Sequence, residues 1–104
     1  ISINPIDFIE RFCNKLNVDE KEVKWIRQIC SVAIDQNIIS ENTPPSIAAG
    51  CIFYYSKEYN LHITKTQISD TCKISEVTIN KCYKKLESNP HIQEFLKTIK
   101  VNKF

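Results

Sequence analysis

Apolar residues recur along this chain at intervals of three and four, the spacing that places side chains on one face of an α-helix. Prolines and helix-capping residues interrupt the pattern and divide the chain into six segments. These segments predict helices over residues 5–16, 20–34, 44–55, 65–72, 76–88 and 90–97. The strict alternation of apolar and polar residues that is typical of strands is absent from the sequence. The pattern therefore predicts an all-α fold.

The third segment is apolar on nearly every side and contains the run Ala48-Ala49-Gly50. A helix without a polar face is a buried helix, and small side chains let its neighbours approach closely. We therefore expect residues 44–55 to form the central helix of a bundle. Residues 1–97 are expected to form one domain, and residues 98–104 a loose tail.

The fourth and fifth segments are separated by only about three residues, the geometry of a helix-turn-helix motif. Thr64 and Gln67 have the spacing of a capping box at the start of the fourth helix, and Ser75 is placed to cap the fifth. On a helical wheel, the inward face of the fifth helix carries Ile79, Cys82, Tyr83 and Leu86. Its outward face carries Val77, Asn80, Lys81, Lys84 and Ser88, with Lys85 at the edge.

This outward face suits DNA. Lysines meet phosphates and release counterions, an asparagine can make two hydrogen bonds to an adenine edge, and a small aliphatic side chain such as Val77 can touch a thymine methyl group. Lys65 and Lys73 lie near the starts of the two helices and add positive charge. Two alternatives stay open: a lysine-rich helix face is often only a solvated surface, and Val77 could pack against the turn at Ile74.

Composition and charge narrow the classes of protein. The 104 residues are 42% hydrophobic and 25% charged, which is globular composition. The net charge is only +2, but residues 1–41 have an excess of acids, whereas residues 65–104 have an excess of lysines. The longest apolar stretch, residues 47–55, is too short to span a membrane, so no membrane partner is expected.

The sequence offers little for catalysis or metal binding. The cysteines are widely spaced without a CxxC pair, which favours reduced, buried thiols in an intracellular protein; they are Cys13, Cys30, Cys51, Cys72 and Cys82. His62 and His91 lie far apart, and one glycine cannot form a glycine-rich phosphate loop. We expect no enzyme activity, no cofactor and no metal. Because the chain starts at Ile1 and contains no methionine, we expect the native protein to extend beyond it.

Three motifs, in order, resemble the transcription factor IIB family. Residues 43–49, Thr-Pro-Pro-Ser-Ile-Ala-Ala, are similar to the Ser-Ile/Val-Ala-Ala helix of the family's cyclin repeats. Residues 76–79, Glu-Val-Thr-Ile, followed by Tyr83, resemble the family's recognition helix, and residues 7–13 resemble the opening of its second repeat. The resemblance covers residues 7–97. It implies an all-α, cyclin-like five-helix bundle with a short additional C-terminal helix, the second of two repeats.

The resemblance also implies a function and a set of DNA-binding residues. The family's second repeat binds promoter DNA upstream of the TATA box, beside the TATA-binding protein, and helps to recruit RNA polymerase II. Transcriptional activators are further candidate partners, and the domain is expected to be a monomer. Localisation would be nuclear, or cytoplasmic for a virus with its own transcription system. The expected DNA-binding residues are Thr64, Lys65, Lys73, Val77, Thr78, Asn80, Lys81 and Lys84.

The sequence departs from the family at Asn80, where the family commonly has an arginine that reads guanine, while Lys84 stands in place of the arginine after the tyrosine. Without the planar fork of arginine, recognition of guanine weakens. We therefore expect weak, mainly phosphate-driven binding with a preference for A·T pairs. Two alternatives remain: a polymerase III counterpart of the factor, or a cyclin-like module that binds only proteins. Trp25 and residues 53–55 would favour the latter if exposed.

Overall fold

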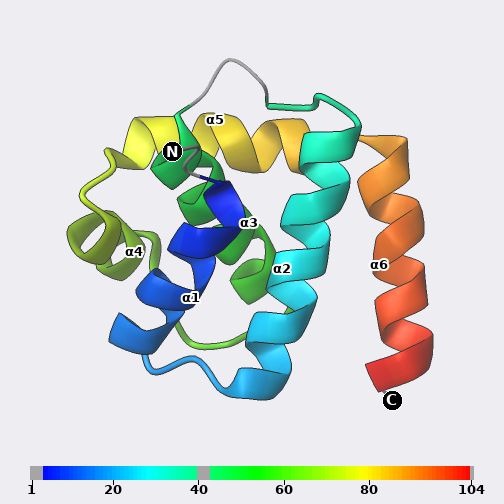
Figure 1. Ribbon diagram of the computed structural model, residues 1–104, viewed down its shortest axis with the longest axis horizontal. Helices are drawn as coiled ribbons and strands as arrows, with labels where there is room; N and C mark the ends of the chain where they lie inside the picture. Colours follow the sequence, from blue (N-terminus) through cyan, green and yellow to red (C-terminus); the bar gives the residue numbers. More distant parts are fainter. Residues whose placement is uncertain (1–3, 40–42, 104) are drawn as a thin grey trace.

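The computed structural model describes residues 4–39 and 43–103. Within these ranges the chain forms helices and no strand (Figure 1). The helices are α1 (Pro5–Lys15), α2 (Glu20–Asp35), α3 (Pro44–Tyr59), α4 (Lys65–Cys72), α5 (Glu76–Glu87) and α6 (Pro90–Lys103). The prediction of an all-α fold is confirmed, and none of the described helices is long and apolar enough to cross a membrane.

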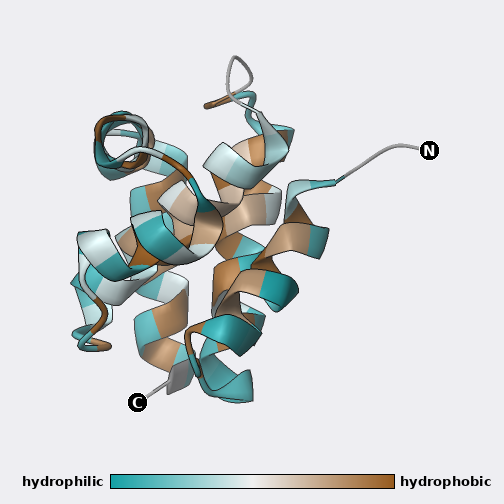
Figure 2. Ribbon diagram, turned by 90° about the vertical axis from the view of Figure 1, so that its left-hand side faces the viewer, coloured by the Kyte–Doolittle hydropathy of each residue, from teal (hydrophilic) through white to brown (hydrophobic). Residues whose placement is uncertain are grey.

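Helix α3 is the centre of the molecule, as its uniformly apolar sequence predicts. It packs against α1, α2, α4 and α5, and every residue from 46 to 56 is buried. Figure 1 shows α5 lying across one end of the bundle, with α4 and α6 towards opposite sides. Coloured by hydropathy, the helices turn their apolar residues inward and their polar residues outward (Figure 2).

Helices α3 and α5 approach each other closely at Gly50. A Cβ atom added at this glycine would lie 2.4 Å from Cβ of Cys82, closer than two non-bonded carbon atoms come. The absence of a side chain at Gly50 therefore lets Cys82 of α5 pack directly against the backbone of α3. Because α5 is the second helix of the helix-turn-helix, this contact fixes its position on the bundle.

The C-terminal helix is longer than its sequence pattern suggests. Residues 98–104 were expected to form a loose tail after a short helix ending near Lys97, but α6 continues to Lys103, so this prediction is wrong for residues 98–103. The reason is that Ile92, Leu96 and Ile99 form one apolar stripe, which is buried in the bundle where α6 packs against α2 and α5. Phe104 lies outside the described residues.

All five cysteines are free and buried, as the sequence predicts. Burial, which disfavours the charged thiolate, raises the pKa of Cys13 and that of Cys72 to about 12. Within the described chain, no three His, Cys, Asp or Glu side chains come together as metal ligands. The thiols act as small apolar groups that fill the core.

Replacing Gly50 with alanine should destabilise the fold. Forcing a methyl group against Cys82 costs about 1–3 kcal/mol, which exceeds the gain in helix propensity of roughly 0.5–1 kcal/mol. Urea unfolding should show a lower midpoint with an unchanged m-value. In a double-mutant cycle, Cys82→Gly should recover part of this loss, because it removes the clashing Cβ; strictly additive effects would contradict the contact.

The buried thiols should make the fold sensitive to alkali. Since the folded state raises the pKa of Cys13 from 9.0 to about 12, its stabilisation is complete below pH 9 and is lost as the pH rises towards 12. Unfolding free energy should therefore fall over this window. Alkylation by iodoacetamide at pH 8 should be slow for the folded chain and fast in urea. Rapid alkylation of the folded chain would show that the thiols are accessible.

Candidate nucleic-acid interface

The first helix of the helix-turn-helix begins with the capping box that its sequence predicts. The Thr64 side chain accepts a hydrogen bond from the backbone N–H of Gln67 at 3.1 Å, and Oε1 of Gln67 accepts one from the N–H of Thr64 at 2.8 Å. The reciprocal bonds satisfy two N–H groups that would otherwise lack partners. Helix α4 is therefore fixed at its start, although it has only eight residues.

The turn between α4 and α5 is held by Ser69. Its hydroxyl donates to the carbonyl oxygen of Ile74 at 2.6 Å, and its own carbonyl accepts from the N–H of Lys73 at 2.9 Å. Lys73 takes a left-handed conformation with φ of 60°, which ends α4 within one residue. Ser75 then caps α5 by accepting from the N–H of Thr78 at 3.2 Å. These bonds fix the angle between the two helices.

The side chains of α5 are arranged as the helical wheel predicts. The inward residues Ile79, Cys82, Tyr83 and Leu86 are buried. On the outward face Lys81 and Lys84 are exposed, Asn80 is half-buried, and Val77 is 65% exposed. Val77 is thus an aliphatic group presented to solvent near the start of the helix and is not packed into the turn at Ile74. Thr78 is half-buried beside the cap, with its Oγ1 2.9 Å from the Ser75 hydroxyl.

Among the described residues, the outward lysines have no acidic partner. In the described part of the chain the ion pairs are Arg27–Glu10 and Lys97–Glu94, neither of which involves α4 or α5. Two acids of the motif are engaged with hydroxyl groups: Glu76 accepts from Thr66, and Glu87 accepts from Tyr83 at 2.7 Å. The positive charge on the outer face of α5 is therefore available to an external anion.

The expected DNA-binding residues fall into two groups. Lys73, on the turn, precedes Val77, Thr78, Asn80, Lys81 and Lys84 on α5. Thr64 and Lys65 begin α4, at the end of that helix away from the turn, and Nζ of Lys65 lies 5.5 Å from the centre of the Phe53 ring. The first group lies on the turn and on α5, whereas the second lies at the junction of α3 and α4.

One basic residue at this junction is not among those that the sequence predicts. Lys57, near the end of α3, places its Nζ 4.8 Å from the ring centre of Tyr83 on α5. It was overlooked because it lies outside the helix-turn-helix in the sequence. Its spacing of four from Phe53 could have identified it, since such pairs share one helix face.

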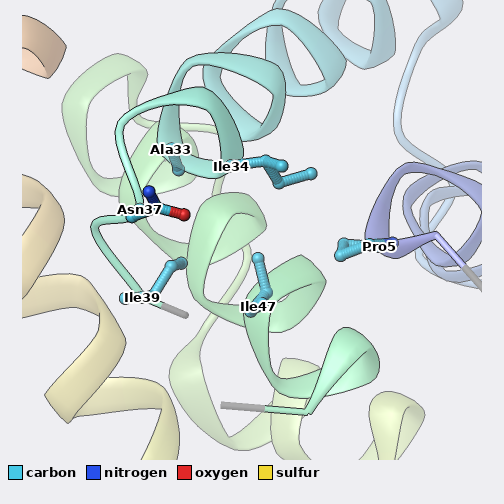
Figure 3. A pocket seen from close by; sticks show the side chains of 6 residues that line it. All are labelled: Pro5, Ala33, Ile34, Asn37, Ile39 and Ile47. Atoms are coloured by element: carbon cyan, nitrogen blue, oxygen red, sulfur yellow. The ribbon is translucent and has the colours of Figure 1, made fainter. Parts of the chain in front are cut away.

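Two other surfaces give weaker grounds for a functional site. An apolar pocket of about 150 Å³ lies between α2, α3 and the start of α1, and the described residues that line it include no charged side chain (Figure 3). The aromatic residues 53–55 are buried and Trp25 is half-buried, so residues 53–55 form no exposed aromatic surface for a protein partner.

The arrangement is that of an all-α repeat with a helix-turn-helix and a basic outer face. A family model described as "Transcription factor TFIIB repeat" matches residues 2–89. The chain is 33% identical over 85 residues to transcription initiation factor IIB of Dictyostelium discoideum, covering 82% of this chain and 26% of that protein. It is 33% identical over 97 residues to transcription initiation factor IIB of Methanothrix thermoacetophila, covering 89% of this chain and 28% of that protein.

A viral protein is similar as well. The putative transcription initiation factor IIB-like protein of Acanthamoeba polyphaga mimivirus is 36% identical over 80 residues, covering 77% of this chain and 17% of that protein. Together, these matches show that the chain belongs to the transcription factor IIB family, as one cyclin-like repeat. It spans about a quarter of the length of the Dictyostelium and Methanothrix relatives.

Proposed function

We propose that this repeat is the DNA-binding, second cyclin-like repeat of a transcription initiation factor. The observation that carries the proposal is the outer face of α5. There Lys81 and Lys84 have no acidic partner among the described residues, and they lie one and two turns after the exposed Val77. A helix face that is buried or whose charges are neutralised does not attract DNA. On this face the lysines can contact phosphates while Val77 contacts the edge of a base.

The mechanism is binding without catalysis. Helix α5 enters the major groove of promoter DNA upstream of the TATA box, with Val77, Thr78 and Asn80 at base edges. Lys73, Lys81 and Lys84 contact phosphates and fix the register of the helix, and Thr64 and Lys65 contact the backbone from the start of α4. The repeat lies beside the TATA-binding protein and helps to bring in RNA polymerase II. A single repeat binds DNA weakly. A second DNA-binding module linked to it would hold the repeat close to the DNA and so raise the overall affinity.

Reversing the charge of Lys81 and Lys84 together should abolish the gel shift that the full-length protein gives with promoter DNA and the TATA-binding protein. The changes replace attraction to phosphates with repulsion. Lys97→Glu with Lys100→Glu on α6 is the matched control, since it changes the net charge equally at two exposed positions. If the protein with both α5 changes still forms the complex normally, the assigned face is wrong.

The residue at position 80 should set the base preference. Selection from random DNA should return A·T-leaning sites of low information for the natural chain. Asn80→Arg should shift the preference to guanine at one position, because a bidentate arginine contact is worth about 1–3 kcal/mol. Asn80→Ala, the control, should lose the preference without gaining guanine. A strong G/C-rich motif from the natural chain would contradict this assignment.

A further inference from the structure

A second basic site lies where the end of α3 meets the start of α4. Lys57 and Lys65 reach it from these two helices, on either side of the connecting loop. Both line an open hollow of about 490 Å³. The other residues that line it are Phe53, Ser56, Asn60, His62, Ile63 and Thr64.

An aromatic pair holds the two ammonium groups. The rings of Phe53 and Tyr83 pack edge to face, with their centres 5.2 Å apart. Nζ of Lys57 lies 4.8 Å from the Tyr83 ring, and Nζ of Lys65 lies 5.5 Å from the Phe53 ring. A ring face attracts a cation without neutralising it, whereas a carboxylate would cancel its charge. Neither ammonium has a carboxylate within 4.0 Å among the described residues.

Hydrogen-bond donors without an acceptor in the described structure lie at or next to the same hollow. The capping box satisfies the N–H groups of Thr64 and Gln67, but those of Lys65 and Thr66, in the first turn of α4, have no acceptor within the described structure. Ser56 lines the hollow, is only 3% exposed, and its hydroxyl oxygen has no hydrogen-bond partner in the described chain. A buried hydroxyl without a partner is uncommon, and an acceptor in the hollow would satisfy this one.

We propose that this hollow is a preorganised phosphate clamp. Its donors are the ammonium groups of Lys57 and Lys65, the first N–H groups of α4 and the hydroxyl of Ser56, a set that matches the several oxygens of one phosphate group. The positive end of the α4 dipole adds to the attraction. Building on the proposed function, the phosphate belongs to the backbone of the DNA duplex that α5 engages.

The clamp is coupled to the recognition helix through Tyr83. This side chain belongs to the inward face of α5, and its ring supports Lys57 while its hydroxyl donates to Glu87. Lys57, one of the two lysines that would bind the phosphate, therefore rests on a side chain of α5. Phosphate contacts of this kind fix the orientation of a recognition helix and carry no sequence information.

The test uses the ¹⁵N-labelled 104-residue chain, titrated at constant ionic strength with a short duplex and, separately, with inorganic phosphate. The amide signals of Lys65 and Thr66 should shift with both probes and saturate. Lys57→Gln with Lys65→Gln should remove these shifts. It should also lower the slope of log K against log salt for the duplex by about 0.9, the value for the one phosphate that the variant no longer neutralises. Lys21→Gln with Lys24→Gln on α2 is the control of equal charge; Lys24 also lies over a ring, that of Trp25.

Ser56→Ala gives an independent check. Because the hydroxyl has no partner in the described chain, its removal should not lower the unfolding midpoint, whereas it should weaken phosphate binding. Unchanged phosphate affinity together with a lower midpoint would assign Ser56 a structural role and remove it from the clamp.

The outcomes separate the clamp from the proposed function. If the natural chain binds the duplex, and the Lys57 and Lys65 variant binds it with the same salt slope and the same amide shifts, the clamp is overturned while DNA binding by α5 stands. If the duplex produces no shift but inorganic phosphate still does, the clamp stands as a site for free phosphate and the proposed function fails. Shifts spread evenly over all lysine-bearing surfaces would overturn the clamp.

Discussion

The contact between Gly50 and Cys82 is the constraint on which the rest of the structure depends. It brings the backbone of α5 against α3, the helix around which the bundle is built. One turn further along, the same packing sets Phe53 of α3 against Tyr83 of α5. The buried side of α5 is thus determined by α3, and its opposite side, with Val77, Lys81 and Lys84, is left to solvent.

The local features could be predicted from the sequence, because their signals lie within a few residues of one another. The capping box of Thr64 and Gln67, the cap at Ser75 and the two faces of α5 are of this kind. Features that depend on packing between helices could not be predicted in this way. The length of α6 depends on the burial of Ile99 against other helices, and the position of Lys57 depends on the ring of Tyr83, which belongs to α5.

The small net charge conceals the electrostatics of the interface. The acids of the first two helices offset the lysines of the helix-turn-helix in the net charge of the chain, but they lie in a different part of the sequence. One of these acids, Glu10, pairs with Arg27, which also belongs to the first two helices. In the helix-turn-helix, Glu76 and Glu87 are bound by hydroxyl groups and not by lysines. The hydrogen-bonded carboxylates keep their charge, and the outer face is basic because its lysines form no ion pair among the described residues.

The bonds that hold the α4–α5 turn have a consequence for how the chain folds. The Ser69 hydroxyl reaches a carbonyl five residues away, and each cap spans three. Such short loops close with little loss of chain entropy, whereas the meeting of residues 50 and 82 must close a long one. We therefore expect the turn to take its native angle early, as a local unit, and the docking of α5 onto α3 to be the later and slower event.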